Sequence, residues 1–272
     1  MSDTLTVNEV YLSIQGESTF AGLPCIFVRL TACNLRCSYC DTAYAFTDGS
    51  KKALTEIREQ INELAKPFAQ KIVGDDVRRL TSNPERETEN AKIQSESRHL
   101  VSYKLPLIEL TGGEPLLQKN SLPLMKSLCD DGFTVLVETS GALDISQVDP
   151  RVHRIMDLKC PSSGESAKNR VENIAHLKST DEIKFVIGTQ QDYDWAKQKI
   201  AEYQLAAICP LLFSWVAPLQ PHQQDKSLKK VPEGQTPISR KELVEKITDD
   251  ALPVRFQLQM HKFIWPPDER GV

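Results

Sequence analysis

The stretch Cys33-Asn34-Leu35-Arg36-Cys37-Ser38-Tyr39-Cys40 places three cysteines on one short segment with CxxxCxxC spacing. Three thiolates on one loop can bind three irons of a four-iron four-sulfur (4Fe-4S) cluster and leave the fourth iron without a protein ligand. An open metal position of this kind can bind a substrate or a cofactor. The spacing therefore predicts an iron–sulfur site with one open iron.

A structural zinc site is the first alternative reading of these cysteines. Such a site normally has four ligands, in two CxxC or CxxH pairs a dozen or more residues apart. The chain has no second pair of this kind, and His99 and His153 are lone residues without ligand spacing. Unrelated buried cysteines are the second alternative.

The composition sets broad limits on the protein. With 272 residues, of which 40% are hydrophobic, the chain is long enough for one large α/β domain spanning 1–272. A net charge of -4 argues against direct nucleic-acid binding. Seven cysteines, three of them too close together for a disulfide framework, favour a reducing compartment. Without an apolar run that could cross a bilayer, we expect a cytoplasmic protein that does not contact membranes.

Strand-like and helix-like patterns alternate along the chain. This alternation predicts a parallel sheet with crossover helices, in a barrel-like α/β fold. We expect strands at 25–30, 107–110, 133–137, 153–158, 182–187, 206–216 and 254–259, and helices at 54–64, 122–128, 171–177, 193–203 and 239–249. The polar stretch 81–99 reads as a surface insertion, and the proline-rich stretch 218–237 reads as a loop.

Polar motifs follow three of the predicted strands. Residues 111–115 read Thr-Gly-Gly-Glu-Pro, where two glycines let backbone approach a ligand closely, although a tight turn is the alternative. Residues 138–141 read Glu-Thr-Ser-Gly, and 157–164 begin Asp-Leu-Lys. In barrel-like α/β folds the ligand-binding residues gather where strands end, so we expect these motifs at one rim.

Arg29 lies within the apolar strand 25–30. Burial of an unpaired charge is costly, so this side chain must find an acidic partner or a ligand. At the two ends of the chain, Ile14-Gln-Gly-Glu17 precedes that strand and His261 ends the last predicted strand.

The CxxxCxxC run and the Gly-Gly-Glu-Pro segment resemble the two signatures of the radical S-adenosylmethionine (SAM) superfamily. Taken together, the motifs resemble one family within it, 7-carboxy-7-deazaguanine synthase (QueE). The resemblance spans nearly the whole chain except 81–99 and 218–237. It is carried by residues 14–17, 24–29, 33–42, 111–115, 138–141, 157–164, His261 and 270–272.

The resemblance implies a modified partial (β/α) barrel of the radical SAM type and a lyase of queuosine and other 7-deazapurine biosynthesis. The family converts 6-carboxy-5,6,7,8-tetrahydropterin to 7-carboxy-7-deazaguanine by a radical ring contraction that loses ammonia. Its cofactors are a 4Fe-4S cluster, SAM and Mg²⁺. It further implies an electron donor such as flavodoxin or ferredoxin, and a homodimer. A radical SAM activase that installs a glycyl radical on a partner enzyme is the alternative, because it shares both signatures.

The family's site residues transfer position by position. Cys33, Cys37 and Cys40 would hold the cluster, and Thr42 would ligate Mg²⁺. The SAM contacts would be Gly113, Glu114, Ser140, Asp157, Leu158, Lys159, Gly188, Thr189, Gln190 and Gln191. The substrate contacts would be Ile14, Gln15, Gly16, Glu17, Arg29, Thr111 and His261. The chain departs from the family at Ser18, where members carry glycine, and in the tail after His261, so Val272 receives no role.

Overall fold

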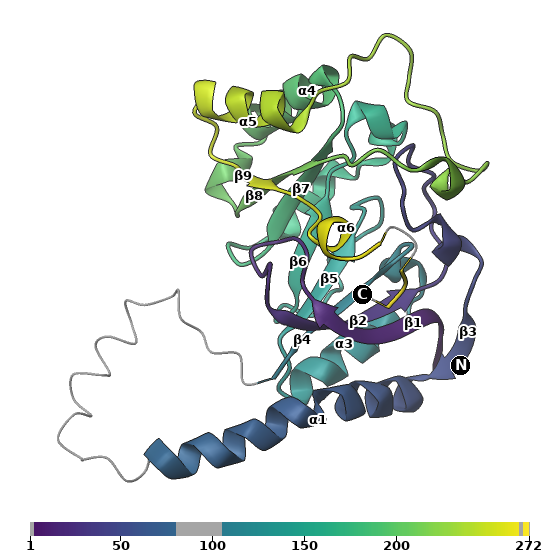
Figure 1. Ribbon diagram of the computed structural model, residues 1–272, viewed down its shortest axis with the longest axis vertical. Coiled ribbons are helices and arrows are strands. Elements are labelled where there is room, and N and C mark those ends of the chain that lie inside the picture. Colours follow the sequence, from purple (N-terminus) through teal and green to yellow (C-terminus); the bar gives the residue numbers. More distant parts are fainter. Residues whose placement is uncertain (1–2, 80–104, 267–268, 272) are drawn as a thin grey trace, which may run out of the picture.

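The computed structural model describes residues 3–79, 105–266 and 269–271, so the predicted insertion 81–99 lies outside the described residues. The described part forms a nine-stranded sheet in the order β3-β1-β2-β4-β5-β6-β7-β8-β9 (Figure 1). Its two edges, β3 and β9, do not pair, so the predicted partial barrel is confirmed as an open sheet. The strands are β1 (Thr4–Ile14), β2 (Pro24–Leu30), β3 (Ser50–Ala53), β4 (Leu107–Gly112), β5 (Val135–Thr139), β6 (His153–Asp157), β7 (Glu182–Ile187), β8 (Leu211–Trp215) and β9 (Arg255–Gln257).

From β2 to β9 the neighbouring strands run parallel, as the alternating pattern predicts. The exception is β1, which pairs antiparallel with both β2 and β3. The pattern of the sequence does not predict β1. Only Leu5 and Val7 of this strand are fully buried, so its apolar signal is weak.

The helices are α1 (Leu54–Arg79), α3 (Ser121–Asp130), α4 (Gln190–Glu202), α5 (Arg240–Asp249) and α6 (His261–Ile264). The predicted helix at 54–64 is only the start of α1. The predicted helix at 171–177 is wrong, because Val171–His176 forms a 3-10 helix. His261 does not end a strand: β9 stops at Gln257, and His261 begins α6. Within 218–237 the chain forms one short 3-10 helix, Pro221–Gln223.

The two faces of the sheet differ in chemistry because successive side chains of a strand point to opposite faces. In β4, Ile108 and Leu110 belong to the large apolar core that includes residues of α1, α3, α4 and α5. Leu107, on the other face, belongs to a small second cluster with Phe27 and Leu136. Farther along β4 on that face stand Glu109 and Thr111. We call the face that carries Leu107, Glu109 and Thr111 the inner face. It is apolar near the starts of the strands and polar toward their ends.

The loop after β1 bridges the open side of the sheet. The Ser18 N–H donates to Gln257 Oε1 (3.0 Å), and Gln257 Nε2 donates to the Ser18 carbonyl (2.6 Å). The Met260 N–H donates to the Gly16 carbonyl (3.2 Å). Hydrogen bonds from this loop thus tie the β9 end of the sheet to β1 in place of strand pairing.

We expect Gln257→Ala to lower the free energy of unfolding by about 1–3 kcal/mol, because it leaves the N–H and C=O groups of Ser18 without partners. Urea denaturation measures the change. The matched control Gln198→Ala, at an exposed position of α4, should change stability by less than about 0.5 kcal/mol. Equal stability of the two variants would show that the bridge contributes nothing.

Candidate active site

A cavity of about 400 Å³ opens on the inner face of the sheet, at the carboxyl ends of the parallel strands. It brings together most of the residues that the sequence singles out, from segments far apart in the chain. Those that line it are Ile14, Gln15, Gly16, Glu17, Arg29, Cys33, Cys37, Cys40, Thr42, Thr111, Gly113, Ser140, Asp157, Lys159 and His261. Glu114, Leu158 and Gly188–Gln191 do not line it.

The three cysteines of the CxxxCxxC run face this cavity as free thiols. Burial raises the pKa of Cys37 to about 11 and that of Cys40 to about 12, so binding of iron by these thiols must displace protons. Among the described residues, no three Cys, His, Asp or Glu side chains converge where a single metal ion could sit. A cluster does not need that convergence, because each thiolate binds a different iron.

The cysteine loop is held from two sides. On one side, Ser38 donates from its hydroxyl to the Ser162 carbonyl (2.6 Å) and from its N–H to the Ser163 carbonyl (3.0 Å). On the other, the Glu114 N–H donates to the Ala32 carbonyl (2.8 Å). A Cβ atom on Gly113 would lie 1.9 Å from the Ala32 oxygen, so only glycine fits there. The Gly-Gly-Glu-Pro segment therefore packs directly on the backbone that enters the cysteine loop.

Glu114 is fully buried, and its carboxylate accepts hydrogen bonds from other groups of the protein. Oε2 accepts from the Ser140 N–H (2.8 Å) and hydroxyl (2.6 Å), and Thr139 and the Leu116 N–H also donate to the carboxylate. Thr139 and Ser140 are the members of this group that line the cavity. A direct contact between Glu114 and SAM stays a prediction.

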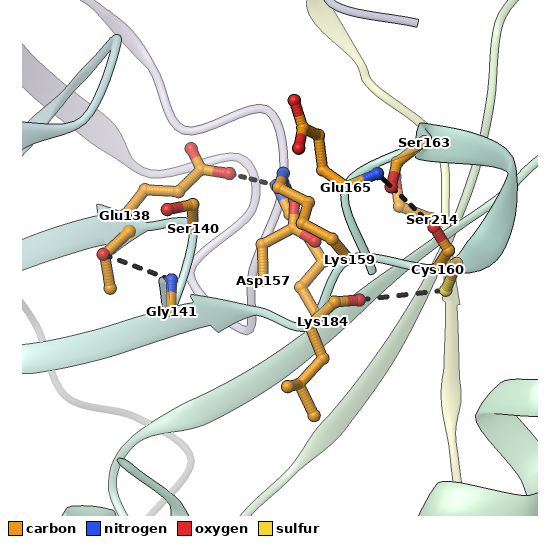
Figure 2. A network of polar contacts seen from close by, with 12 residues as sticks. Glu138, Ser140, Gly141, Asp157, Lys159, Cys160, Ser163, Glu165, Lys184 and Ser214 are labelled. Atoms are coloured by element: carbon orange, nitrogen blue, oxygen red, sulfur yellow. Dashed lines mark hydrogen bonds and ion pairs between the residues drawn. The ribbon is translucent and has the colours of Figure 1, made fainter. Parts of the chain in front are cut away.

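Asp157 and Lys159 form an ion pair at the end of β6 (Nζ–Oδ2 2.6 Å), and Figure 2 shows them beside Glu138 and Lys184. Burial is the largest single effect and opposes the charged form of Lys159, but Asp157, Cys37 and Glu138 together outweigh it and raise the pKa of the lysine. Asp157 Oδ1 and the Tyr39 hydroxyl are buried without a hydrogen-bond partner among the described residues, and both residues line the cavity. Buried polar groups normally have partners, so these atoms fit a polar ligand.

Arg29 finds the acidic partner that its position in an apolar strand requires. Its Nε donates to Glu9 Oε1 (2.7 Å), and its NH2 donates to the Tyr11 hydroxyl (2.7 Å). Burial raises the pKa of Tyr11 to about 12, against the opposing effect of Arg29. Arg29 also lines the cavity, so its charge can act on a ligand.

Lys184 and Glu109 line the cavity but were not predicted as site residues. Lys184 Nζ lies 3.3 Å from Glu17 Oε2 and is also paired with Glu138. Glu109 accepts a hydrogen bond from the Gln15 amide. The signal that could have found both residues is the one used for Arg29, a charge inside an apolar strand, although the strand of Lys184 also contains Glu182.

Thr42 lies beside Asp41, whose Oδ1 accepts from the threonine hydroxyl (2.9 Å). Asp41 is also paired with Lys262 (2.6 Å). Its pKa is lowered, because Lys262 and His261 outweigh the effect of burial. Burial lowers the pKa of His261. Hydroxyl and carboxylate oxygens thus meet at one side of the cavity.

The turn 188–191 satisfies its polar groups within the protein. Thr189 caps α4, and the N–H groups of Gly188 and Thr189 donate to Asp192 Oδ2 (2.9 and 3.0 Å). The amides of Gln190 and Gln191 bond to Asp194 and to the Gly234 carbonyl. Leu158 belongs to the apolar core. The SAM contacts of these residues stay predictions.

Comparisons with known proteins find relatives that match nearly the full length of the chain. The chain is 36% identical over 275 residues to the 7-carboxy-7-deazaguanine synthase of Koribacter versatilis, covering 98% of this chain and 100% of that protein. It is 36% identical over 272 residues to the synthase of Chlorobaculum tepidum, covering 98% and 97%. The crystal structure of QueE from Escherichia coli shares the fold, with a TM-score of 0.59 at 17% identity and 95% coverage of both chains. No family model matches the chain, and within the described residues no helix is long and apolar enough to span a membrane.

We expect Glu114→Gln to lower the free energy of unfolding by about 1–3 kcal/mol. The new amide nitrogen cannot accept the hydrogen bonds that now end on the carboxylate, so buried donors lose their acceptor. Urea denaturation of this variant and of Glu59→Gln, an exposed control on α1, measures the effect. A Glu114→Gln protein as stable as the control would contradict the assigned hydrogen bonds.

Proposed function

The chain belongs to the 7-carboxy-7-deazaguanine synthase family, and from this membership we propose that its cavity binds SAM and a pterin side by side next to the cysteine loop. The reaction is the radical ring contraction of 6-carboxy-5,6,7,8-tetrahydropterin to 7-carboxy-7-deazaguanine with loss of ammonia. The observation that carries the proposal is a single cavity that joins three free cysteines, unpartnered acceptors and an arginine.

Cys33, Cys37 and Cys40 would hold the 4Fe-4S cluster. When bound, the cluster and SAM supply the one-electron chemistry that removes a hydrogen atom from the substrate. The protein's part is to hold the ligands, fix their orientation and exclude water. The anchoring of Ser38 and the close packing of Gly113 serve this purpose, because they fix the loop that carries the thiols.

The SAM contacts would come from the ends of β4, β5 and β6. Lys159 can donate to a carboxylate, and Asp157 Oδ1 can accept from an amine or a hydroxyl. Glu114 acts indirectly by holding Ser140 in the cavity wall. Gly113 would let the backbone come close to SAM. Leu158 and the turn 188–191 would provide the remaining SAM contacts.

The pterin would lie against Ile14, Gln15, Gly16, Glu17, Arg29, Thr111 and His261. The Glu17 carboxylate can accept from the N–H groups of a guanine-like edge, and Arg29 suits the substrate carboxylate. Burial raises the pKa of Glu17, but the charges of Lys184 and His261 and the hydrogen bond from Gln259 together outweigh burial, so the pKa is lowered. Glu17 is thus an ionised acceptor near neutral pH.

Mg²⁺ would bind at the Thr42 hydroxyl and at the substrate carboxylate. A hard cation of this kind is commonly held by one or two protein oxygens together with waters and substrate oxygens. The adjacent Asp41 carboxylate adds negative charge at this position. The proposal also includes an electron donor such as flavodoxin or ferredoxin, a homodimer and a cytoplasmic location.

The pterin contacts favour a small-molecule enzyme over an activase of a partner protein. Gln15, Glu17, Arg29 and His261 line one cavity rather than a flat exposed surface. The experiment that tests the function is an anaerobic assay of the reconstituted protein with 6-carboxytetrahydropterin, SAM, Mg²⁺ and a reductant. We expect the ultraviolet spectrum of 7-carboxy-7-deazaguanine to develop. Formation of deoxyadenosine without this product would exclude the assigned substrate.

We expect Cys37→Ala to abolish reductive cleavage of SAM, because a cluster cannot be held at this site by two thiolates and keep its activity. Deoxyadenosine production and the iron and sulfide content of the reconstituted protein are measured. Cys129→Ala, a cysteine away from the cavity, is the control and should keep both. Deoxyadenosine production by the Cys37 variant would contradict the cluster assignment.

We expect Thr42→Ala to raise the half-saturating Mg²⁺ concentration by about tenfold, the equivalent of one lost interaction of about 1.4 kcal/mol. Turnover slows, while the cluster content stays the same. Thr47→Ala, exposed on the same segment, is the control. Unchanged Mg²⁺ dependence in the Thr42 variant would remove this residue from the metal site.

A further inference from the structure

Three acidic side chains surround one lysine on the inner face of the sheet. Lys184 of β7 is paired with Glu17 from the loop after β1 and with Glu138 of β5. Glu109 of β4 stands beside them, and all four residues line the cavity. Lys184 is 4% exposed and Glu109 is 2% exposed, so water does little to screen these charges.

Glu109 has no cation of its own among the described residues. In its one side-chain hydrogen bond with a described residue, Glu109 accepts from Gln15 Nε2. The titratable groups that act on it or feel its charge are Lys184 on β7, Tyr11 on β1, Cys25 on β2, Glu138 and Glu17. Lys184 is the one cation among these groups, and it is already paired with two other carboxylates. In this position the protonated form of a buried carboxyl has a lower free energy than the ionised form.

The Gln15 amide joins Glu109 to the loop that carries Glu17. Gln15 Nε2 donates to Glu109, and Gln15 Oε1 accepts from the Glu17 N–H (3.2 Å). Gln15 itself is 4% exposed, so both ends of its amide are committed to the protein. The position of Glu17, which meets Lys184 at the far end of this chain of contacts, therefore depends on Glu109.

We propose that Glu109 is a positioning residue that works as a neutral carboxylic acid, holding the Gln15 amide and through it the Glu17 carboxylate in the substrate site. The role of Glu17 as a substrate contact rests on the proposed function; the protonation of Glu109 does not. Burial, followed by the charge of Glu138, raises the pKa of Glu109 well above its usual range, in agreement with the charge count.

Ionisation of Glu109 would change the balance around Lys184. Lys184 is paired with Glu138 and Glu17 and also feels the charge of Asp157, and ionisation of Glu109 would add one more negative charge to this group. The new charge would repel Glu138 and Glu17 and attract Lys184. The Glu17 carboxylate would then lose part of its attachment, and binding of the pterin would weaken at alkaline pH.

The first test measures protonation directly and does not require turnover. Infrared difference spectra are recorded at neutral pH for the reconstituted enzyme against Glu109→Gln, with the exposed Glu172→Gln as control. We expect the carbonyl stretch of a protonated carboxylic acid in the wild-type spectrum, lost in Glu109→Gln and retained in Glu172→Gln. Loss of a carboxylate band in place of the acid band would overturn the proposal.

The second test uses the pH dependence of stability. A carboxyl whose pKa is higher in the folded state than in the unfolded state binds more protons when folded, so wild-type stability falls as pH rises above the unfolded pKa. Glu109→Gln lacks this group. Between about pH 5 and pH 9 the wild-type folding constant should therefore fall relative to that of the variant, by at most about tenfold per pH unit. A constant ratio over this range would contradict a neutral Glu109.

The third test separates positioning from a merely structural role. In the synthase assay we expect the wild-type KM for the pterin to rise at alkaline pH with little change in kcat, and Glu109→Gln to lack that rise. Glu109→Ala should have a raised KM at every pH, because Gln15 loses its acceptor. An alkaline rise in KM that persists in Glu109→Gln would overturn the proposal. If the synthase assay yields no product, the first two tests still decide the state of Glu109.

Discussion

Charges buried on the inner face of the sheet must be paired, neutralised or left for a ligand, and this constraint shapes that whole face. Arg29 is paired with Glu9, Lys159 with Asp157, and Lys184 with two carboxylates. The opposite face carries the apolar core and the helices, so it provides the burial that stabilises the fold. The inner face can then be devoted to polar contacts.

The cysteine loop depends on the same arrangement of strand ends. Its backbone is held by Ser162 and Ser163 after β6 and is packed against Gly113 at the end of β4. The thiols therefore enter the cavity next to Asp157 and Lys159, which lie at and just after the end of β6, more than a hundred residues away in the sequence. Fixed backbone on both sides is what an iron–sulfur site needs to keep one position open.

Much of this could be predicted from the sequence, because the deciding signals are local. The strand at 182–187 and the helix capped by Ser239 have the boundaries that the pattern gives, and the spacing of the cysteines marks the loop. The missed features depend on tertiary contacts. The antiparallel β1 is mostly half-buried and has no clean alternation, and Lys184 and Glu109 acquire a role only where separate strands meet. The turn 188–191 likewise depends on a tertiary contact, because its polar groups form hydrogen bonds with α4 and with the Gly234 carbonyl instead of facing the cavity.

The central claim is that the three thiols hold a cluster with one open iron, and that Asp157 and Lys159 stand beside it to receive SAM. The most direct measurement is the electron paramagnetic resonance spectrum of the reduced, reconstituted protein recorded before and after addition of SAM. The account predicts a cluster signal whose shape changes when SAM is added. A cluster signal that SAM leaves unchanged would contradict it.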